Sequence, residues 1–255
     1  MRRNWKPGIA GLLLLGGCAR SETKQPVTTT AGSDTSISVP GARADARGQT
    51  LVRVVNAHPN LAGVTVKTDN QTPFTEVAYK TVTPYREVED NVTKFEVFDS
   101  KTGVTSDPLA VNREIMADGS RYTVVVMPDR DGSGVMIRAL RDELMPDEGK
   151  AKIRLVNAAP ASGEVDLNVQ GRQEPLFDDV NPGSEAGFKN VDPVTGPLML
   201  RQENGKRTLV TVRDSAALEA GKSYTIVLAG RAGGWQAITF EDAVQGVGAG
   251  VTPKP

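Results

Sequence analysis

Short runs of apolar residues, many of them alternating with polar residues, fill the chain from about residue 49 to residue 244. In Val64-Thr-Val-Lys67 and Val165-Asp-Leu-Asn-Val169 the period is two, as expected for strands with one face toward a core. Thr123-Val-Val-Val126 and Thr225-Ile-Val-Leu228 are β-branched runs, which favour strands. No stretch keeps the 3.6-residue apolar period of a helix for long. The pattern predicts an all-β protein.

One strand-like run occurs twice in the chain. Val52-Arg-Val-Val-Asn-Ala-His-Pro59 returns, about a hundred residues later, as Ile153-Arg-Leu-Val-Asn-Ala-Ala-Pro160, which indicates a tandem repeat. We therefore expect two units, residues 49–144 and 151–244, joined by the short segment 145–149. Each unit is large enough to close a small core of its own.

A second landmark in both units is an apolar residue followed by Gly and then Tyr, each three positions on. Met116, Gly119 and Tyr122 have this spacing, and Leu218, Gly221 and Tyr224 repeat it. It is the spacing of a tyrosine corner, in which a Tyr at the start of a strand bonds to the backbone of the preceding loop. With turn signals every ten or so residues, the landmarks predict two tandem antiparallel β-sandwiches, immunoglobulin-like or Greek-key, of roughly seven strands each.

These motifs resemble the secreted β-sandwich family catalogued as domain of unknown function 4397. Its members open with Arg-Val-x-(Asn/His)-Ala-x-Pro and carry Gly-x-x-Tyr-Thr-Val-x-Val late in the unit. The matching segments are Arg53 to Pro59 and Gly119 to Val126, then Arg154 to Pro160 and Gly221 to Leu228. The resemblance implies tandem sandwiches, a lipoprotein or cell-surface location and no attached activity. The opening strand alone also resembles the periplasmic adaptor of alginate O-acetylation.

The N-terminus has the layout of a secretory signal. Arg2 and Arg3 precede the apolar run Leu12-Leu-Leu-Leu15, which is too short to span a bilayer. Leu15-Gly-Gly-Cys18 resembles the lipobox of bacterial lipoproteins, which implies cleavage before Cys18 and acylation of its thiol. We therefore expect residues 1–17 to be a signal peptide, and an ordinary signal with an incidental cysteine is the alternative.

Residues 18–48 are rich in Ser, Thr, Pro, Ala and Gly, which predicts a flexible, disordered tether between the lipidated cysteine and the folded units. Residues 245–255 predict a loose tail. The acyl chains imply anchoring to a membrane of the cell envelope. Because Ala19 and not Asp follows Cys18, the lipoprotein resemblance favours the outer membrane in a host with two membranes. In other hosts it favours the outer face of the cytoplasmic membrane.

Composition limits the possible chemistry. The chain has 30 basic and 31 acidic residues and no basic stripe, which argues against nucleic acid as a partner. Cys18 and His58 are the single cysteine and the single histidine, so an intramolecular disulfide and a Cys/His metal cluster are excluded. We expect no cofactor.

The sequence gives no catalytic constellation. A hydrolytic triad needs a base beside the nucleophile, usually His, and the second unit has Ala159 in place of His58. We interpret His58 as a surface or turn residue. The second unit lacks carboxylates where the first has Asp129-Arg-Asp131-Gly-Ser133, and this segment is interpreted as a hairpin turn instead of a calcium loop.

Scattered carboxylates and loop aromatics are the remaining candidates. Asp178, Asp179 and Asp192 could bind a cation or act as a carboxylate pair on a glycoside, although loop carboxylates are usually solvated. Binding is expected in the loops at the sandwich ends. The candidate partner-binding residues are Trp235, Tyr79, Tyr85 and Phe177.

We interpret the chain as a non-enzymatic, membrane-anchored binding, adhesion or scaffold module. Its partner would be an envelope protein or a polysaccharide. One alternative is an accessory adaptor in exopolysaccharide modification of the O-acetylation type. The other is a weak carboxylate-based glycan hydrolase.

Overall fold

The computed structural model describes residues 50–69, 71–88, 91–202, 205–212 and 217–242. All of them belong to one compact unit. The predicted signal peptide, Cys18, the tether and the tail lie outside the described residues. None of the helical turns in the described ranges has the length and apolar character needed to cross a membrane.

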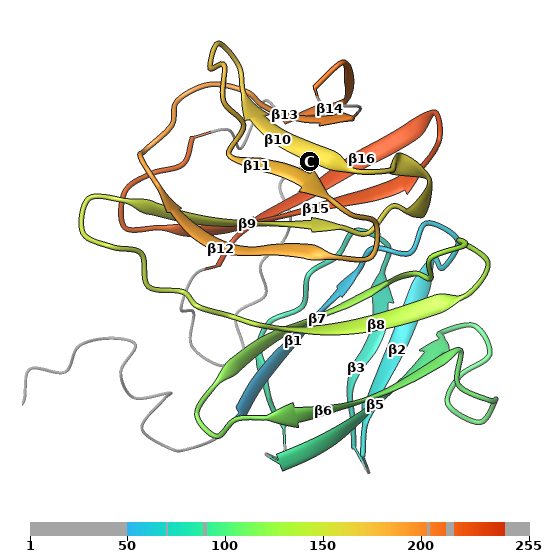
Figure 1. Cartoon of the computed structure of the whole chain (residues 1–255). Coiled ribbons are helices and arrows are strands. Elements are labelled where there is room, and N and C mark those ends of the chain that lie inside the picture. The colour runs from blue at the N-terminus through green and yellow to red at the C-terminus, as the bar shows by residue number, and fades with distance from the viewer. Residues whose placement is uncertain (1–49, 70, 89–90, 203–204, 213–216, 243–255) are drawn as a thin grey trace, which may run out of the picture. The chain divides into compact units, whose positions relative to one another are not determined.

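The first repeat is a sandwich of two four-stranded sheets (Figure 1). Its inner sheet has the order β4-β1-β7-β8 and its outer sheet the order β3-β2-β5-β6. The strands are β1 (Thr50–Asn56), β2 (Gly63–Thr68), β3 (Gln71–Ala78), β4 (Arg86–Val88), β5 (Asn91–Asp99), β6 (Ala110–Met116), β7 (Arg121–Pro128) and β8 (Val135–Arg141).

The second repeat has the same strand order, with β12-β9-β15-β16 as its inner sheet and β11-β10-β13-β14 as its outer sheet. The elements are β9 (Ala151–Asn157), the 3-10 helix η1 (Pro160–Ser162), β10 (Val165–Val169), β11 (Phe177–Val180), β12 (Glu185–Val191), β13 (Leu198–Gln202), β14 (Arg207–Val212), β15 (Ser223–Arg231) and β16 (Gly234–Glu241). The predicted all-β fold of two tandem sandwiches is confirmed.

In one respect the predicted antiparallel pairing is wrong. The first strand of each repeat pairs in parallel with the seventh, β1 with β7 and β9 with β15. Every residue of β1 and of β9 is buried, so these strands are covered on both faces. Strands buried on both faces are typical of parallel pairing and show no alternation of polar and apolar residues.

Three cores hold the described residues together. One lies between the two sheets of the first repeat, and a second lies between the two sheets of the second repeat. A third, which we call the shared core, joins the inner sheets of both repeats and includes Val55, Val125, Val156, Val227 and Phe240. Each fully buried side chain of this size contributes about 1.5–3 kcal/mol, so the shared core stabilises the contact between the repeats.

Both tyrosine corners are present. The backbone N–H of Ala117 donates to the hydroxyl oxygen of Tyr122 at 2.9 Å, and that of Glu219 donates to Tyr224 at 3.1 Å. Each Tyr begins the strand after the loop that it bonds to, as the spacing predicted. The bond fixes the loop against the inner sheet in each repeat.

Candidate functional site

The arginines of the repeated motif lie inside the shared core. Arg53 and Arg154 are 2% and 0% exposed. In each repeat the Nε of this arginine donates to a threonine hydroxyl on the parallel neighbour strand. The acceptors are Thr123 and Thr225, both at 2.9 Å. The two copies of the motif therefore place the same buried cation on the same face.

Each arginine then crosses to a carboxylate of the other repeat. Nη2 of Arg154 donates to Oδ1 of Asp142 at 2.6 Å, and Nη2 of Arg53 donates to Oδ1 of Asp242. Both carboxylates are fully buried as side chains. The hydroxyl of Thr123 donates to Asp142 at 2.9 Å and accepts from both arginines, so its hydrogen-bonding capacity is filled.

Aromatic rings close this network. The guanidinium of Arg53 lies 4.7 Å from the ring centre of Tyr85 and 4.6 Å from that of Phe240. Phe188 covers Arg154 at 4.6 Å. Burial lowers the pKa of Arg53, but the neighbouring Asp242, Tyr85 and Asp142 outweigh it, so the pKa is raised above its ordinary value. The cluster is a closed crossed ion-pair network that fixes one repeat against the other.

The Asn-Ala-x-Pro loops that follow β1 and β9 are held by their asparagines. Nδ2 of Asn56 donates to the carbonyls of Leu61 and Val77, and Oδ1 accepts the backbone N–H of His58. Asn157 makes the equivalent set of bonds in the second repeat. Both asparagines therefore hold the corner that follows the first strand of their repeat.

A cavity of ≈ 410 Å³, here called the inter-repeat pocket, opens where these two loops meet the last hairpin turn of each repeat. Each repeat contributes a loop proline and a turn arginine, Pro59 and Arg130 from the first, Pro160 and Arg231 from the second. Parallel pairing places the carboxyl ends of β1 and β7 at the same edge, and likewise β9 and β15. The pocket therefore forms where four strand ends converge.

Charge in the inter-repeat pocket is uneven. Arg130 and Arg231 are exposed, and neither guanidinium has a hydrogen bond or an ion pair with another described side chain. The one carboxylate in the lining, Asp131, accepts the backbone N–H of Ser133 at 2.8 Å, and hydrogen bonding to Ser133 lowers its pKa. The pocket thus presents two cations and one carboxylate already engaged in its own turn.

Gly230 forms part of the pocket wall at a position that only glycine can occupy. Its φ is 104°, and a Cβ there would lie 2.3 Å from the carbonyl oxygen of Gly234. The backbone of the second turn can therefore approach the cavity more closely than any side chain would permit.

His58 lies beside this pocket, and its interpretation as a surface residue is wrong. It is 5% exposed, because its ring fills the space between the first loop and the β7–β8 turn. Nδ1 accepts the backbone N–H of Asn60 at 3.3 Å, so Nε2 carries the proton and donates to the carbonyl of Gly134 at 3.2 Å. Burial lowers the pKa of His58, and the nearby charge of Arg231 lowers it further.

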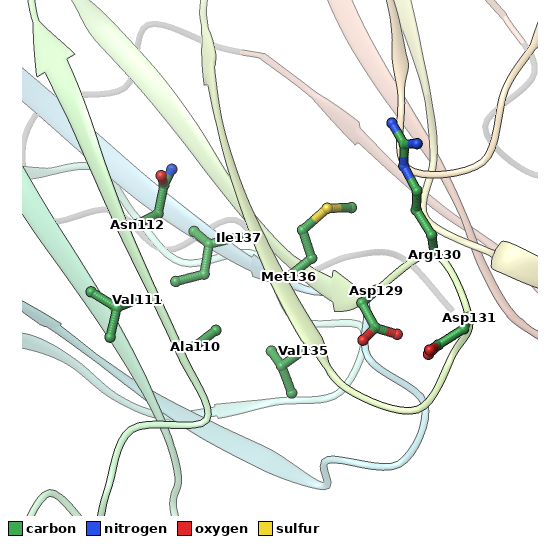
Figure 2. Close-up of a pocket in the computed structure, with 9 residues that line it drawn as sticks. All are labelled: Ala110, Val111, Asn112, Asp129, Arg130, Asp131, Val135, Met136 and Ile137. Carbon is green, nitrogen blue, oxygen red and sulfur yellow. The ribbon is translucent and has the colours of Figure 1, made fainter.

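A second cavity, of ≈ 570 Å³, lies beside the edge strands β6 and β8 (Figure 2). Val111 and Ile137 form apolar walls, and Asp129 lies at the base of the turn. Oδ1 of Asp129 is buried without a hydrogen-bond partner among the described residues. Figure 2 shows Arg130 extending away from these apolar side chains, and it lines the inter-repeat pocket as well.

Two of the four predicted partner-binding aromatics are buried, and their assignment is corrected. Tyr85 is 6% exposed and donates to Oδ2 of Asp142 at 2.6 Å, within the crossed ion-pair network. Phe177 is 8% exposed in the core of the second repeat. Neither presents a face to a partner.

The other two aromatics, Trp235 and Tyr79, are half-buried. Trp235 packs against the core of the second repeat. Tyr79 packs against the shared core, and burial raises its pKa while Arg231 lowers it. Tyr79 therefore lies within the electrostatic reach of the pocket arginine and stays a candidate.

The structure also locates the acidic candidates. The segment at Asp129 to Ser133 is the hairpin turn that was predicted, closed by a bond from the N–H of Asp129 to the carbonyl of Gly134. Asp192 pairs with Lys150 at 2.7 Å, and this hydrogen bond lowers the pKa of Asp192. Across the described ranges, no three His, Cys, Asp or Glu side chains gather in a group that could hold a metal ion.

Comparison with known proteins gives a family match over part of the chain. The family model described as Domain of unknown function (DUF4397) matches residues 50–168, the first repeat and the start of the second. The resemblance drawn from the motifs is therefore confirmed over these residues. No curated protein matches the chain.

Two solved structures are similar at low TM-scores. The C-terminal domain of AlgF from P. aeruginosa is 21% identical, with 37% of this chain and 99% of that chain covered and a TM-score of 0.29. A proposed cell adhesion protein from Bacteroides uniformis is 8% identical, with 78% of this chain and 100% of that chain covered and a TM-score of 0.25. At these TM-scores neither likeness carries an argument about this chain.

Proposed function

We propose that this chain, whose residues 50–168 match the DUF4397 family, is a non-enzymatic binding module of the cell envelope. Its binding surface is the inter-repeat pocket. One observation carries the proposal: a cavity of ≈ 410 Å³ takes its walls from two loops and two turns, one of each from either repeat. Ligand pockets commonly measure about 300–1,000 Å³ and favour interfaces between domains.

The chemistry around the pocket supports binding over catalysis. Both ring nitrogens of His58 are engaged with backbone groups, and its low pKa keeps it neutral. The lining carboxylate, Asp131, is a fully exposed turn residue with a lowered pKa. A general acid or base works best with a pKa near the operating pH, and the pKa of each group is shifted away from neutral pH.

The proposal also includes attachment of the chain to a membrane. Acylation of Cys18 would attach the module to a membrane, with the outer membrane favoured in a host that has two. An envelope protein or a polysaccharide would be the partner. Cys18→Ala should move the protein from the membrane fraction to the soluble fraction on cell fractionation, with Ser21→Ala as the matched control. Retention of the Cys18→Ala protein in the membrane fraction would contradict the anchor.

Capture of envelope glycans and envelope proteins by the full chain tests the binding surface. Ala161→Trp places a large ring at the pocket wall, where Ala161 is exposed, and should abolish capture. Ala117→Trp is the matched control, because Ala117 is exposed in the loop before β7, at the opposite end of the sandwich.

Loss of capture in Ala161→Trp alone supports the pocket. Equal capture by both variants would refute it. Capture of a polysaccharide-modifying enzyme would select the adaptor alternative, and capture of a glycan would select direct adhesion.

A further inference from the structure

We infer that the inter-repeat pocket binds an anionic group, a carboxylate or a phosphate, held between Arg130 of the first repeat and Arg231 of the second. This inference rests on the proposed function, because it names the ligand chemistry of the same pocket.

The two guanidiniums are the charged groups of the pocket lining that have no hydrogen-bond partner among the described residues, and together they outnumber the single carboxylate, Asp131. In the shared core, by contrast, Arg53 and Arg154 are each neutralised by a buried carboxylate. Arg130 and Arg231 have no such partner among the described residues, although both line one cavity. A guanidinium presents a planar fork of donors that matches the two oxygens of a carboxylate or a phosphate.

The groups around Arg231 leave its charge uncompensated at close range. Its field lowers the pKa of His58 and of Tyr79, which places it near both side chains. Both are uncharged at neutral pH. Asp129 also acts on His58 from the β7–β8 turn, but it forms no ion pair with Arg231. An incoming anion would therefore meet a cation that the fold has not neutralised.

The remaining lining limits how the ligand can be held. Pro59, Pro128 and Pro160 offer ring faces and no backbone N–H. Asp131 is engaged with Ser133 in its own turn. The charged donors of the lining are thus the two arginines, and they come from different repeats. The ligand would bridge the two turns, so an isolated repeat could supply only half of the site.

His58 provides a direct reporter of binding. It is the single histidine of the chain, so its ring signals in an NMR spectrum need no assignment among histidines. Arg231 lowers its pKa. An anion that neutralises Arg231 should therefore raise the pKa of His58.

The experiment titrates the labelled full chain with glutarate, with inorganic phosphate and with neutral glucose, at constant ionic strength. Glutarate, phosphate or both should shift the His58 ring signals, and glucose should not. Arg130→Gln or Arg231→Gln should weaken anion binding by about tenfold or more, as expected for loss of a charge-assisted hydrogen bond. In Arg231→Gln the His58 pKa should rise without ligand and should respond less to the anion than in the parent chain.

Arg113→Gln is the matched control, because Arg113 is exposed on β6 and does not line the pocket. A response to glutarate alone identifies a carboxylate ligand, and a response to phosphate alone identifies a phosphate ligand. The inference is overturned if neither anion shifts His58, if glucose shifts it equally, or if Arg113→Gln weakens binding as much as Arg231→Gln.

The experiments distinguish failure of the proposed binding function from failure of the proposed anionic ligand. If Ala161→Trp abolishes capture while both anions leave His58 unchanged, the pocket binds its partner but not through an anion. If Ala161→Trp leaves capture intact, the proposed function fails whatever the anions do.

Discussion

The two repeats are alike on the inner sheets, where they meet, and differ in the loops that follow β1 and β9. On the inner sheets the same arginine, threonine and aspartate positions recur, and each arginine reaches the other repeat. At the loops, His58 of the first repeat corresponds to Ala159 of the second. The arginine, threonine and aspartate positions kept in both copies hold the repeats together, whereas the position of His58 and Ala159 makes the two pocket loops differ.

The loops that follow β1 and β9 are held in place by different side chains. In the first repeat the ring of His58 joins Asn60 to the β7–β8 turn. In the second repeat η1 forms instead, and the hydroxyl of Ser162 bonds to Asn157 and to the carbonyl of Gly163. The imidazole thus ties together two walls of the pocket, whereas the serine acts only within its own loop.

The largest loss of stability is expected when one of the crossed ion pairs, which recur in both repeats, is broken. Arg154→Ala leaves Asp142 buried without its partner and should lower the free energy of unfolding by about 3–5 kcal/mol. Arg53→Ala should lower the free energy of unfolding by a similar amount, because it removes the equivalent ion-pair partner of Asp242. Urea denaturation measures both, and Arg113→Ala on the surface should stay within about 0.5 kcal/mol of the parent. A cost below that margin for either buried arginine would contradict the crossed network.

A smaller, pH-dependent change in stability is expected from His58, which has no counterpart in the second repeat. The pKa of His58 is lowered in the folded state, so the unfolded state binds the proton more readily. The stability that this histidine contributes is therefore present above its ordinary pKa of 6.5 and is lost as the pH falls toward the folded value.

Urea denaturation between about pH 7.5 and pH 5 should show this loss in the parent chain. His58→Ala should have the shallower pH dependence and should lose about 1 kcal/mol at neutral pH. Carboxylates titrate in both proteins, so the difference between the two curves isolates the imidazole. Parallel curves would show that His58 does not titrate differently on folding.

The smallest loss of stability is expected at the tyrosine corners, which are present in both repeats. Tyr122→Phe and Tyr224→Phe each remove one hydrogen bond to a loop N–H, and each should cost about 1 kcal/mol. Thermal unfolding should shift by the same amount in both variants. Thr105→Ala, at an exposed turn, is the control. If the melting temperature of only one variant were unchanged, the two tyrosine corners would not contribute equally to stability.

Local motifs were sufficient to predict the fold class, the repeat and the tyrosine corners. The parallel pairing of β1 with β7 was missed, although the burial of all of β1 and of β7 after Arg121 agrees with it. Antiparallel pairing would have sent their carboxyl ends to opposite edges. The pocket could therefore not be assembled from the sequence.

The site residues were harder to predict for the same reason. Arg130 and Arg231 lie about a hundred residues apart, and neither belongs to a motif that predicts binding. Tyr85 and Phe177 were assigned to loops that bind a partner, whereas Tyr85 bonds to Asp142 and Phe177 begins β11 inside the core of the second repeat. The burial of Arg53 and Arg154 could not be predicted from their own repeat, because the carboxylates that allow it come from the other repeat.

The position of β1 also has a mechanical consequence. This strand lies between β4 and β7 and is the first described element of the chain. Tension transmitted from a membrane anchor would enter the fold at Thr50. A pull along β1 would load the hydrogen bonds on both of its sides in shear, together with the crossed ion pair of Arg53. A strand so clamped resists extraction far better than an edge strand whose bonds open one at a time.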